Sequence, residues 1–169
     1  LGMSGRLRLF NIKKYNKIKH DHFALKTNKE QLLIFNDVRR FGFIDYDKSN
    51  KICSKKYIVN LGLEALDHYL TGKYLQSKIS NKMVQIKQIL LDQTIIAGIG
   101  NIYASEILFN AKISPLELGK DLSLVNCNKL VFSTKKILQR AISAGGSTLK
   151  DYVSTDGTLG NFQNKFKVY

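Results

Sequence analysis

Residues 1–47 alternate polar and apolar side chains with the two-residue period of β-strands. The run Arg6–Phe10 alternates charged and apolar residues, which places its apolar side chains on one face of a sheet. Four strands are predicted, at residues 6–10, 22–26, 31–35 and 41–46. The second and third flank the polar stretch 27–30, so we expect them to form a hairpin. The pattern therefore predicts a small antiparallel sheet.

From Leu61 onward the spacing of apolar residues becomes helical. Leu63, Leu66 and Leu70 lie three and four positions apart and predict a first helix. A second helix is predicted from the spacing of Ile79, Met83, Ile86 and Leu90, with its end near Gln93.

Two further helices are predicted in the last third of the chain. One extends from Asn101 to about Asn110 and is stopped by Ile113-Ser114-Pro115. The other is long, with Ser123 as its N-cap and Gly145-Gly146 as its end. Its predicted apolar stripe is Leu124, Leu130, Ile137, Leu138 and Ile142. A terminal strand is predicted at residues 166–168.

The polar stretch 47–60 separates the two patterns and is interpreted as a domain boundary. We therefore expect an α+β protein of two domains. Residues 1–60 would form part of an antiparallel β-sandwich, and residues 61–169 an all-helical domain that ends in the terminal strand.

Charge narrows the class of partner. The chain of 169 residues has 27 Lys and Arg against 13 Asp and Glu, a net charge of +14. Such an excess opposes compaction unless a polyanion or a dispersed surface distribution of the charge offsets it, and nucleic acid is the leading class of partner. No run of about 18 apolar residues is present, so no membrane-spanning helix is expected. Cys53 and Cys127 lack metal-binding spacing and are expected to be reduced.

A glycine-bearing turn at residues 95–106 is the first candidate for binding chemistry. It joins two predicted helices and contains Gly98, Gly100 and Asn101. The first N–H groups of a helix have no partner within it, and small residues let a phosphate approach them closely. Asn101 would cap the second helix or contact a ligand. The alternative is an ordinary corner whose glycines serve only the backbone conformation.

A second candidate is the predicted sheet corner Arg39-Arg40-Phe41. Guanidinium groups contact phosphates or base edges, and an aromatic ring can enter between bases. Alternatively, the arginines are solvated and Phe41 belongs to the core. His20 and His22 share a strand face, but no third ligand is near in sequence, so a phosphate contact or a plain surface position is favoured over a metal site.

Lysines and a polar loop complete the candidates. Lys78, Lys82 and Lys87 precede the glycine turn, where they would bind phosphates or form a solvated basic face. Residues 145–152 could close over a ligand, although a plain helix end is equally consistent.

Four motifs occur in order along the chain. They are Leu1-Gly2-Met3-Ser4-Gly5, Asn36-Asp37-Val38-Arg39-Arg40-Phe41-Gly42, residues 98–106, and residues 154–162 with Phe166-Lys167-Val168-Tyr169. Together they resemble the formamidopyrimidine-DNA glycosylase family, which includes endonuclease VIII, and the last motif is closer to the formamidopyrimidine branch. The resemblance implies a β-sandwich, a helix-two-turn-helix domain and a zinc finger. It also implies removal of oxidised purines such as 8-oxoguanine and formamidopyrimidines from duplex DNA, followed by cleavage of the abasic strand.

The resemblance assigns roles to individual residues. Those implied to fill the gap left by an extruded base are Met3, Arg39 and Phe41. Those implied to bind DNA are His20, Arg39, Lys82, Lys87, Asn101 and Tyr103, with Lys87 and Asn101 on phosphates beside the lesion. The loop implied to cover the extruded base includes Ser147, Thr148, Leu149, Lys150 and Tyr152.

The family's catalytic groups have no match in this sequence. Its nucleophile is an N-terminal proline assisted by a neighbouring glutamate, whereas the chain begins at Leu1 and its one proline is Pro115. The zinc finger has no match either. We therefore expect a piece of a base-excision-repair DNA glycosylase and AP lyase that binds damaged double-stranded DNA but is inactive alone, with no catalytic residue and no metal of its own.

Two alternatives remain open. One is a non-catalytic module that binds damaged DNA, and the weaker one is a basic RNA- or ribosome-associated protein. The expected setting is a monomer associated with the nucleoid in the bacterial cytoplasm.

Overall fold

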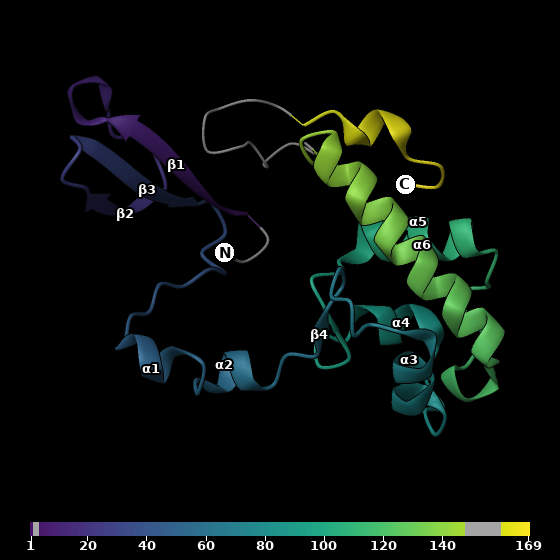
Figure 1. The fold of residues 1–169 in the computed structure, drawn as a ribbon. Helices are drawn as coiled ribbons and strands as arrows, with labels where there is room; N and C mark the ends of the chain where they lie inside the picture. Colours follow the sequence, from purple (N-terminus) through teal and green to yellow (C-terminus); the bar gives the residue numbers. More distant parts are fainter. Residues whose placement is uncertain (2–3, 148–159) are drawn as a thin grey trace. The chain divides into compact units, whose positions relative to one another are not determined.

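The computed structural model describes residue 1, residues 4–147 and residues 160–169 (Figure 1). The chain divides into two compact units. Unit 1 comprises Leu1–Tyr46 and Ser143–Lys165, and unit 2 comprises Asp47–Ile142 and Phe166–Tyr169. Unit 1 carries an antiparallel sheet and unit 2 most of the helices, so the predicted α+β class is confirmed.

The sheet of unit 1 contains β1 (Gly5–Asn11), β2 (Asp21–Lys26) and β3 (Gln31–Asp37), in the order β1-β3-β2. Both pairings are antiparallel, and Gly5 lies opposite Asp37 at one end of the sheet while Asn11 lies opposite Gln31 at the other. Three predicted strands and the hairpin are thus confirmed. The short helix η1 (Ile12–Lys14) follows β1.

The fourth predicted strand, at residues 41–46, is wrong. The backbone there is irregular, and Arg40 just before it has φ of 56°, in the left-handed region that interrupts an extended chain. The N–H of Gly42 donates to the carboxylate of Asp37 at 2.8 Å instead of joining a ladder. The aromatic side chains of Phe41, Phe43 and Tyr46 are exposed.

Unit 2 begins with two single-turn helices, α1 (Ser49–Ile52) and α2 (Lys56–Val59), in the stretch expected to be a polar connection. Strand β4 (Leu63–Glu64) then pairs in parallel with β5 (Ile96–Ala97). The helix predicted from Leu63, Leu66 and Leu70 is therefore wrong, because Leu63 belongs to this two-stranded sheet. Leu70 is buried in the loop that follows, and Leu66 is exposed.

The helix predicted across residues 79–90 is broken into two. Ile79 ends α3 (Gly72–Ile79), and Ile86 begins α4 (Ile86–Leu91). Between them the backbone pairs with residues 117–120: the N–H of Ile86 donates to the carbonyl of Glu117, and the N–H of Gly119 to that of Val84. Ile79, Ile86 and Leu90 are all buried. The helical spacing of these apolar residues therefore comes from two separate helices that both pack against the core.

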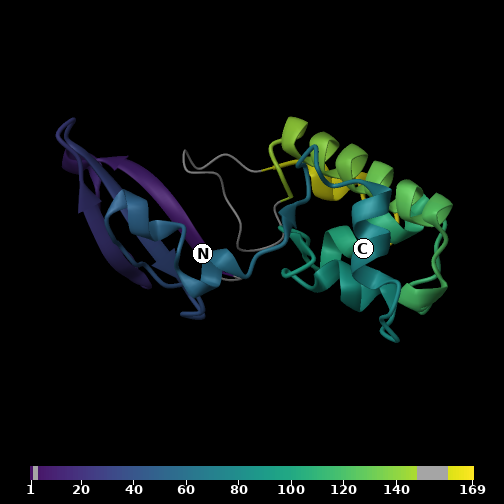
Figure 2. The ribbon, with the colours of Figure 1, turned by 60° about the horizontal axis from the view of Figure 1, so that its bottom comes forward.

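The other helices follow their predicted bounds closely. The glycine turn leads into α5 (Asn101–Ala111), and η2 (Gly119–Asp121) precedes the long α6 (Leu124–Ser143). Figures 1 and 2 show α6 lying along the shorter helices α3, α4 and α5. Ser123 caps α6 as predicted, since its hydroxyl accepts from the N–H of Asn126 at 3.2 Å. Gly145 and Gly146 have φ of 76° and 85° just after α6, which confirms the predicted stop.

The buried face of α6 differs from the predicted stripe. It consists of Cys127, Leu130, Val131, Ser133, Thr134, Ile137 and Ala141. Leu124 and Leu138 are half-buried, and Ile142 is exposed. The hydroxyl of Thr134 is tolerated in this core because it donates to the carbonyl of Leu130 at 2.8 Å.

The predicted terminal strand at residues 166–168 is also wrong. The chain instead forms η3 (Phe162–Lys165) and then an irregular segment that binds to the side chain of Glu106. No helix within the described residues is long and apolar enough to cross a membrane.

Candidate nucleic-acid interface

The glycine turn in unit 2 is held by the side chain of Gln93. The amide oxygen accepts from the N–H of Gly98 at 2.8 Å, and the amide nitrogen donates to the carbonyls of Ile99 at 2.9 Å and Leu91 at 3.2 Å. One side chain thus satisfies backbone groups on both sides of the turn. This arrangement fixes the loop without filling its outer surface.

Both glycines of the turn leave the backbone open to solvent. Gly98 has φ of 94°, which favours glycine, but Gly100 has φ of −105°, which any residue adopts. A Cβ added at either position would meet no atom of the described protein within 4 Å. At Gly100, therefore, neither the backbone nor the surrounding protein requires glycine. What the missing side chain provides is access for an external group to the backbone.

Asn101 is not the N-cap that the sequence predicted. Gly100 occupies the cap position of α5 with no side-chain cap hydrogen bond, and Asn101 is the first residue of the helix, with its side chain exposed. The first N–H groups of α5 are consequently free of side-chain capping. An 11-residue helix with this open N-terminus can donate to an anion.

Asp92 and Lys82 lie beside this turn. The hydroxyl of Thr94 donates to Asp92 at 2.6 Å, and the N–H of Thr94 donates at 3.0 Å. These bonds, with a smaller contribution from the charge of Lys82, hold the pKa of Asp92 below its usual value. Lys82 is half-buried in the loop between α3 and α4.

Lys87 and Tyr103 are positioned by α4 and α5, and both are half-buried. Lys87 lies at a cavity of about 450 Å³ whose other lining residues are Ser105, Leu108, Phe109, Lys112, Ile113, Pro115 and Val168. Lys78 differs from the other two candidate lysines, because its ammonium lies over the ring of Tyr74 at 5.6 Å on the exposed side of α3.

A buried carboxylate fixes the C-terminal segment against α5. Glu106 is 5% exposed, and both of its oxygens accept from the N–H of Lys167 at 3.0 Å. One of them also accepts from the N–H of Val168 at 2.9 Å. This role was not predicted, although a glutamate within an apolar helix is itself a signal of a specific partner.

In unit 1, the corner after β3 is built around Asp37. The hydroxyl of Ser4 donates to its buried carboxylate at 2.5 Å and accepts from the N–H of Arg39 at 3.0 Å. The Ser4 hydroxyl, followed by the N–H of Gly42, lowers the pKa of Asp37, so the carboxyl stays ionised. These hydrogen bonds hold the backbone of Arg39 and of Gly42, on the two sides of Arg40, to Ser4 and Asp37.

Arg39 and Phe41 project from this corner into solvent. The guanidinium of Arg39 lies 5.1 Å from the centre of the Phe41 ring, and Phe41 is 63% exposed. The alternative that Phe41 belongs to the core is therefore excluded. A cation beside an exposed ring is an arrangement that can stack on a base while contacting a phosphate.

His20 and His22 are attached to the same corner through the backbone of Asp37. The carbonyl of His20 accepts from the N–H of Asp37 at 3.1 Å, and a ring nitrogen of His22 lies 2.9 Å from the carbonyl of Asp37. His20 has φ of 72°. Across the described ranges, no group of three His, Cys, Asp or Glu residues could hold a metal ion.

The candidates thus fall into two groups, one in each unit. Unit 1 brings together His20, Arg39 and Phe41; unit 2 carries Lys82, Lys87, Asn101 and Tyr103. Ser147, the first residue of the predicted covering loop, pairs with Asn161. Met3, Thr148, Leu149, Lys150 and Tyr152 lie outside the described residues. Sequence reasoning missed Gln93, Glu106 and the anchoring role of Asp37.

Comparison with known proteins shows the family of the chain. Residues 1–44 match the formamidopyrimidine-DNA glycosylase N-terminal domain, and residues 61–153 match the formamidopyrimidine-DNA glycosylase H2TH domain. A formamidopyrimidine-DNA glycosylase of Zymomonas mobilis is 48% identical over the whole chain, which spans 62% of that relative. One of Wolbachia pipientis is 45% identical, and the chain spans 61% of it.

Solved structures give the same result. The Lactococcus lactis Fpg in complex with DNA containing an abasic site has a TM-score of 0.86 and 32% identity, and the match covers 98% of this chain and 60% of that one. MutM in complex with DNA containing carbocyclic 8-oxo-G also has a TM-score of 0.86, with 32% identity over 99% of this chain and 60% of that one. The chain therefore spans about three fifths of the length of these relatives, and it belongs to the formamidopyrimidine-DNA glycosylase family.

Proposed function

We propose that residues 1–169 form the DNA-gripping part of a base-excision-repair DNA glycosylase and AP lyase that acts on oxidised purines in duplex DNA. The substrates proposed are 8-oxoguanine and formamidopyrimidines, and the protein would work as a monomer on the bacterial nucleoid. The single observation that carries the proposal is the open turn at Gly98 and Gly100, where Gln93 fixes a bare backbone in front of an uncapped helix.

The turn is suited to a phosphate beside the lesion. Its exposed backbone permits close approach, and the N-terminus of α5 supplies donors whose dipole favours negative charge. Asn101 at the first helical position adds a side-chain amide, while Lys82 and Lys87 on neighbouring elements add positive charge. Contacts of this kind position DNA without reading its sequence.

The corner in unit 1 would act on the base pairs themselves. An enzyme that works on a base inside a duplex must first extrude it, and inserted side chains compensate for the lost stacking. Phe41 and Arg39 already project into solvent from a corner held by the Asp37 carboxylate. Because that support is buried, insertion of these side chains would require no rearrangement of the sheet.

We assign the lyase step to groups other than those of residues 1–169. In the family that the chain resembles, an N-terminal proline attacks the sugar; the only proline here, Pro115, is exposed after α5. We propose that residues 1–169 alone bind DNA without cutting it. The resemblance implies zinc only for a zinc finger outside residues 1–169, and we propose that residues 1–169 bind no metal themselves.

The test uses the complete natural protein and a duplex with one 8-oxoguanine opposite cytosine. We expect base release, strand cleavage and a covalent complex that borohydride traps, none of which occurs with the undamaged duplex. Damage-selective binding without release or trapping would replace the proposal with the alternative of a non-catalytic damaged-DNA-binding module. Failure to bind either duplex would overturn both.

A companion measurement addresses residues 1–169 as a separate polypeptide. We expect it to bind a duplex that carries a tetrahydrofuran abasic analogue and to leave an 8-oxoguanine duplex uncut. Borohydride trapping by this polypeptide would refute its assignment as binding-only. Equal affinity for structured RNA and damaged duplex DNA at matched salt would favour a general basic RNA-binding protein instead.

A further inference from the structure

The segment that leads into unit 2 carries a concentration of positive charge that the proposed function leaves unexplained. Residues 47–60, here called the lysine segment, contain Lys48, Lys51, Lys55 and Lys56 but only one acidic residue, Asp47. The net charge of the segment is therefore 4 − 1 = +3. Lysine runs are common on solvated surfaces, so the local contacts must decide whether these lysines serve the fold.

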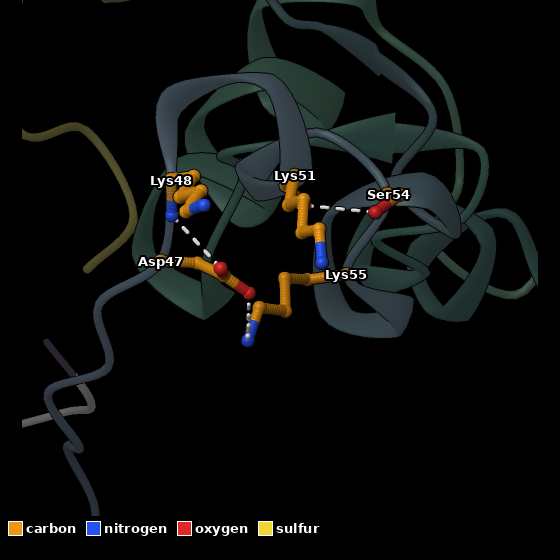
Figure 3. Close-up of polar contacts among 5 residues, drawn as sticks. All are labelled: Asp47, Lys48, Lys51, Ser54 and Lys55. Atoms are coloured by element: carbon orange, nitrogen blue, oxygen red, sulfur yellow. Dashed lines mark hydrogen bonds and ion pairs between the residues drawn. The ribbon is translucent and has the colours of Figure 1, made fainter.

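Only one of the four lysines has an ionic partner among the described residues. The ammonium of Lys55 lies 3.0 Å from the carboxylate of Asp47, which also accepts from the N–H of Lys48 at 2.8 Å. Figure 3 shows the side chain of Asp47 reaching the ammonium of Lys55. No carboxylate within the described ranges pairs with the ammonium of Lys48, Lys51 or Lys56.

The fold gains little from these lysines. Neither α1 nor α2 buries a residue, and each is a single turn of four residues, a length that is unstable in isolation. Lys48 and Lys55 stand at the N-cap positions of the two helices, where neither makes a cap hydrogen bond. Positive charge at a helix N-terminus is unfavourable. Local stability therefore provides no reason for three unpaired lysines here.

Backbone hydrogen bonds connect the end of the lysine segment to the strand that leads into the glycine turn. Two residues beyond its end, the N–H of Gly62 donates to the carbonyl of Gln93 at 2.8 Å, and β4 then pairs with β5. A Cβ at Gly62 would lie 2.3 Å from the carbonyl oxygen of Ile95, so the junction tolerates no side chain. Gln93, whose side chain fixes the glycine turn, thus also accepts a hydrogen bond from the backbone just after the lysine segment, within unit 2.

We propose that the lysine segment is an additional DNA-backbone site, in which Lys48, Lys51 and Lys56 bind phosphates outside those contacted by the glycine turn. The inference rests on the proposed function, because it assumes that the turn holds duplex DNA. Ammonium groups recognise phosphate charge without base preference, so the site adds affinity and not lesion selectivity. The Asp47 carboxylate keeps Lys55 from the same role.

The test measures the salt dependence of DNA binding by the complete natural protein. The variant is Lys48→Gln/Lys51→Gln/Lys56→Gln. The matched control is Lys14→Gln/Lys26→Gln/Lys29→Gln, which removes equal charge from exposed lysines at the end of the sheet opposite Asp37. Fluorescence anisotropy gives Kd for an abasic-analogue duplex and for the matching undamaged duplex between 50 and 200 mM salt. Circular dichroism confirms that both variants are folded.

The expected effect follows from counterion release. Each phosphate contact contributes about 0.9 to the slope of log K against log salt, so three lost contacts reduce the slope by about 2.7. Over a fourfold salt change, the wild-type protein should lose about 40-fold more affinity than the triple variant. The ratio of the two Kd values, damaged to undamaged, should stay unchanged. The Asp47→Asn variant should instead bind more tightly, because it frees Lys55.

The outcomes separate the two proposals. If the wild-type protein binds neither duplex, the proposed function fails. If it binds and the triple variant has the slope of the control, the lysine segment is not a DNA site and the proposed function stands. A changed damaged-to-undamaged ratio in the triple variant would also overturn the assignment, since it would place the lysines at the lesion.

Discussion

Replacing Glu106 by glutamine tests whether one buried carboxylate holds the C-terminal segment against α5. The carboxylate receives three contacts of 2.9–3.0 Å from two N–H donors, those of Lys167 and Val168. Glutamine offers one oxygen in place of two, and its amide nitrogen would face an N–H group. At least one charge-assisted hydrogen bond is therefore lost in Glu106→Gln, and any remaining bond becomes a neutral one.

The magnitude follows from these contacts. A hydrogen bond to a charged group contributes about 1.5–3 kcal/mol net, against about 1 kcal/mol for a neutral pair. Because Lys167 and Val168 are exposed and their freed N–H groups can bind water, we take the lower part of the range, about 2 kcal/mol. For a chain of this size that corresponds to a fall in Tm of about 4–8 °C.

The assay is urea and thermal unfolding followed by circular dichroism, with amide hydrogen exchange at Lys167 and Val168. The control is Glu64→Gln, which removes the same charge from an exposed side chain. We expect Glu106→Gln alone to be destabilised and to exchange faster at both amides. Equal unfolding free energies in the two variants, with unchanged exchange, would refute the assigned role of Glu106.

Three further predictions concern the glycine turn and the corner in unit 1. Gln93→Ala should weaken binding to an abasic-analogue duplex about tenfold in anisotropy titrations, because a loosened turn costs about 1.4 kcal/mol of binding free energy; unchanged affinity would contradict the role of Gln93. Phe41→Ala should leave the unfolding free energy within about 0.5 kcal/mol, since the ring is 63% exposed, while reducing release of 8-oxoguanine by the complete protein. Its control is Phe43→Ala, and equal loss in both variants would speak against insertion of Phe41. Asp37→Asn should flatten the acid limb of the stability curve. The folded-state pKa of Asp37 is lowered, so its contribution is present above the unfolded pKa of about 4 and is lost as the pH falls through the folded-state pKa. An unchanged acid limb in urea melts at several pH values would refute that linkage.

The sequence predicted those elements whose signals are local. Strands β1, β2 and β3, the helix α5 and the Ser123 cap of α6 each carry their pattern within a few residues. The predictions at residues 41–46 and 166–168 failed because the backbone donors there bind the side chains of Asp37 and Glu106. The partners in the second case lie 61 positions apart, beyond the reach of any periodicity.

The helical errors have a related cause. Leu63 fits a helical spacing, but it belongs to β4, which pairs with β5. Ile79 also fits one, but the backbone after it pairs with residues 117–120 and so interrupts the helix. Among the site residues, Arg39 and Phe41 were found because residue type and order are visible in the sequence. Gln93 was not, because an ordinary exposed glutamine becomes significant only when three backbone groups converge on it.

The use of acidic side chains explains how a chain of net charge +14 can keep its fold and still present positive charge to the proposed polyanion. Asp37, Asp92 and Glu106 are each hydrogen-bonded to backbone N–H groups and so fasten a corner, a turn and a terminal segment. Carboxylates engaged in this way stabilise the loops but do not form close pairs with the lysines beside them. The unpaired ammonium groups then stay available for phosphates, and the proposed binding of DNA would relieve the self-repulsion that they impose on the free protein. The two features therefore belong together. If these carboxylates paired with lysines instead of backbone N–H groups, the loops would lose their hydrogen bonds and the proposed binding surface would lose positive charge.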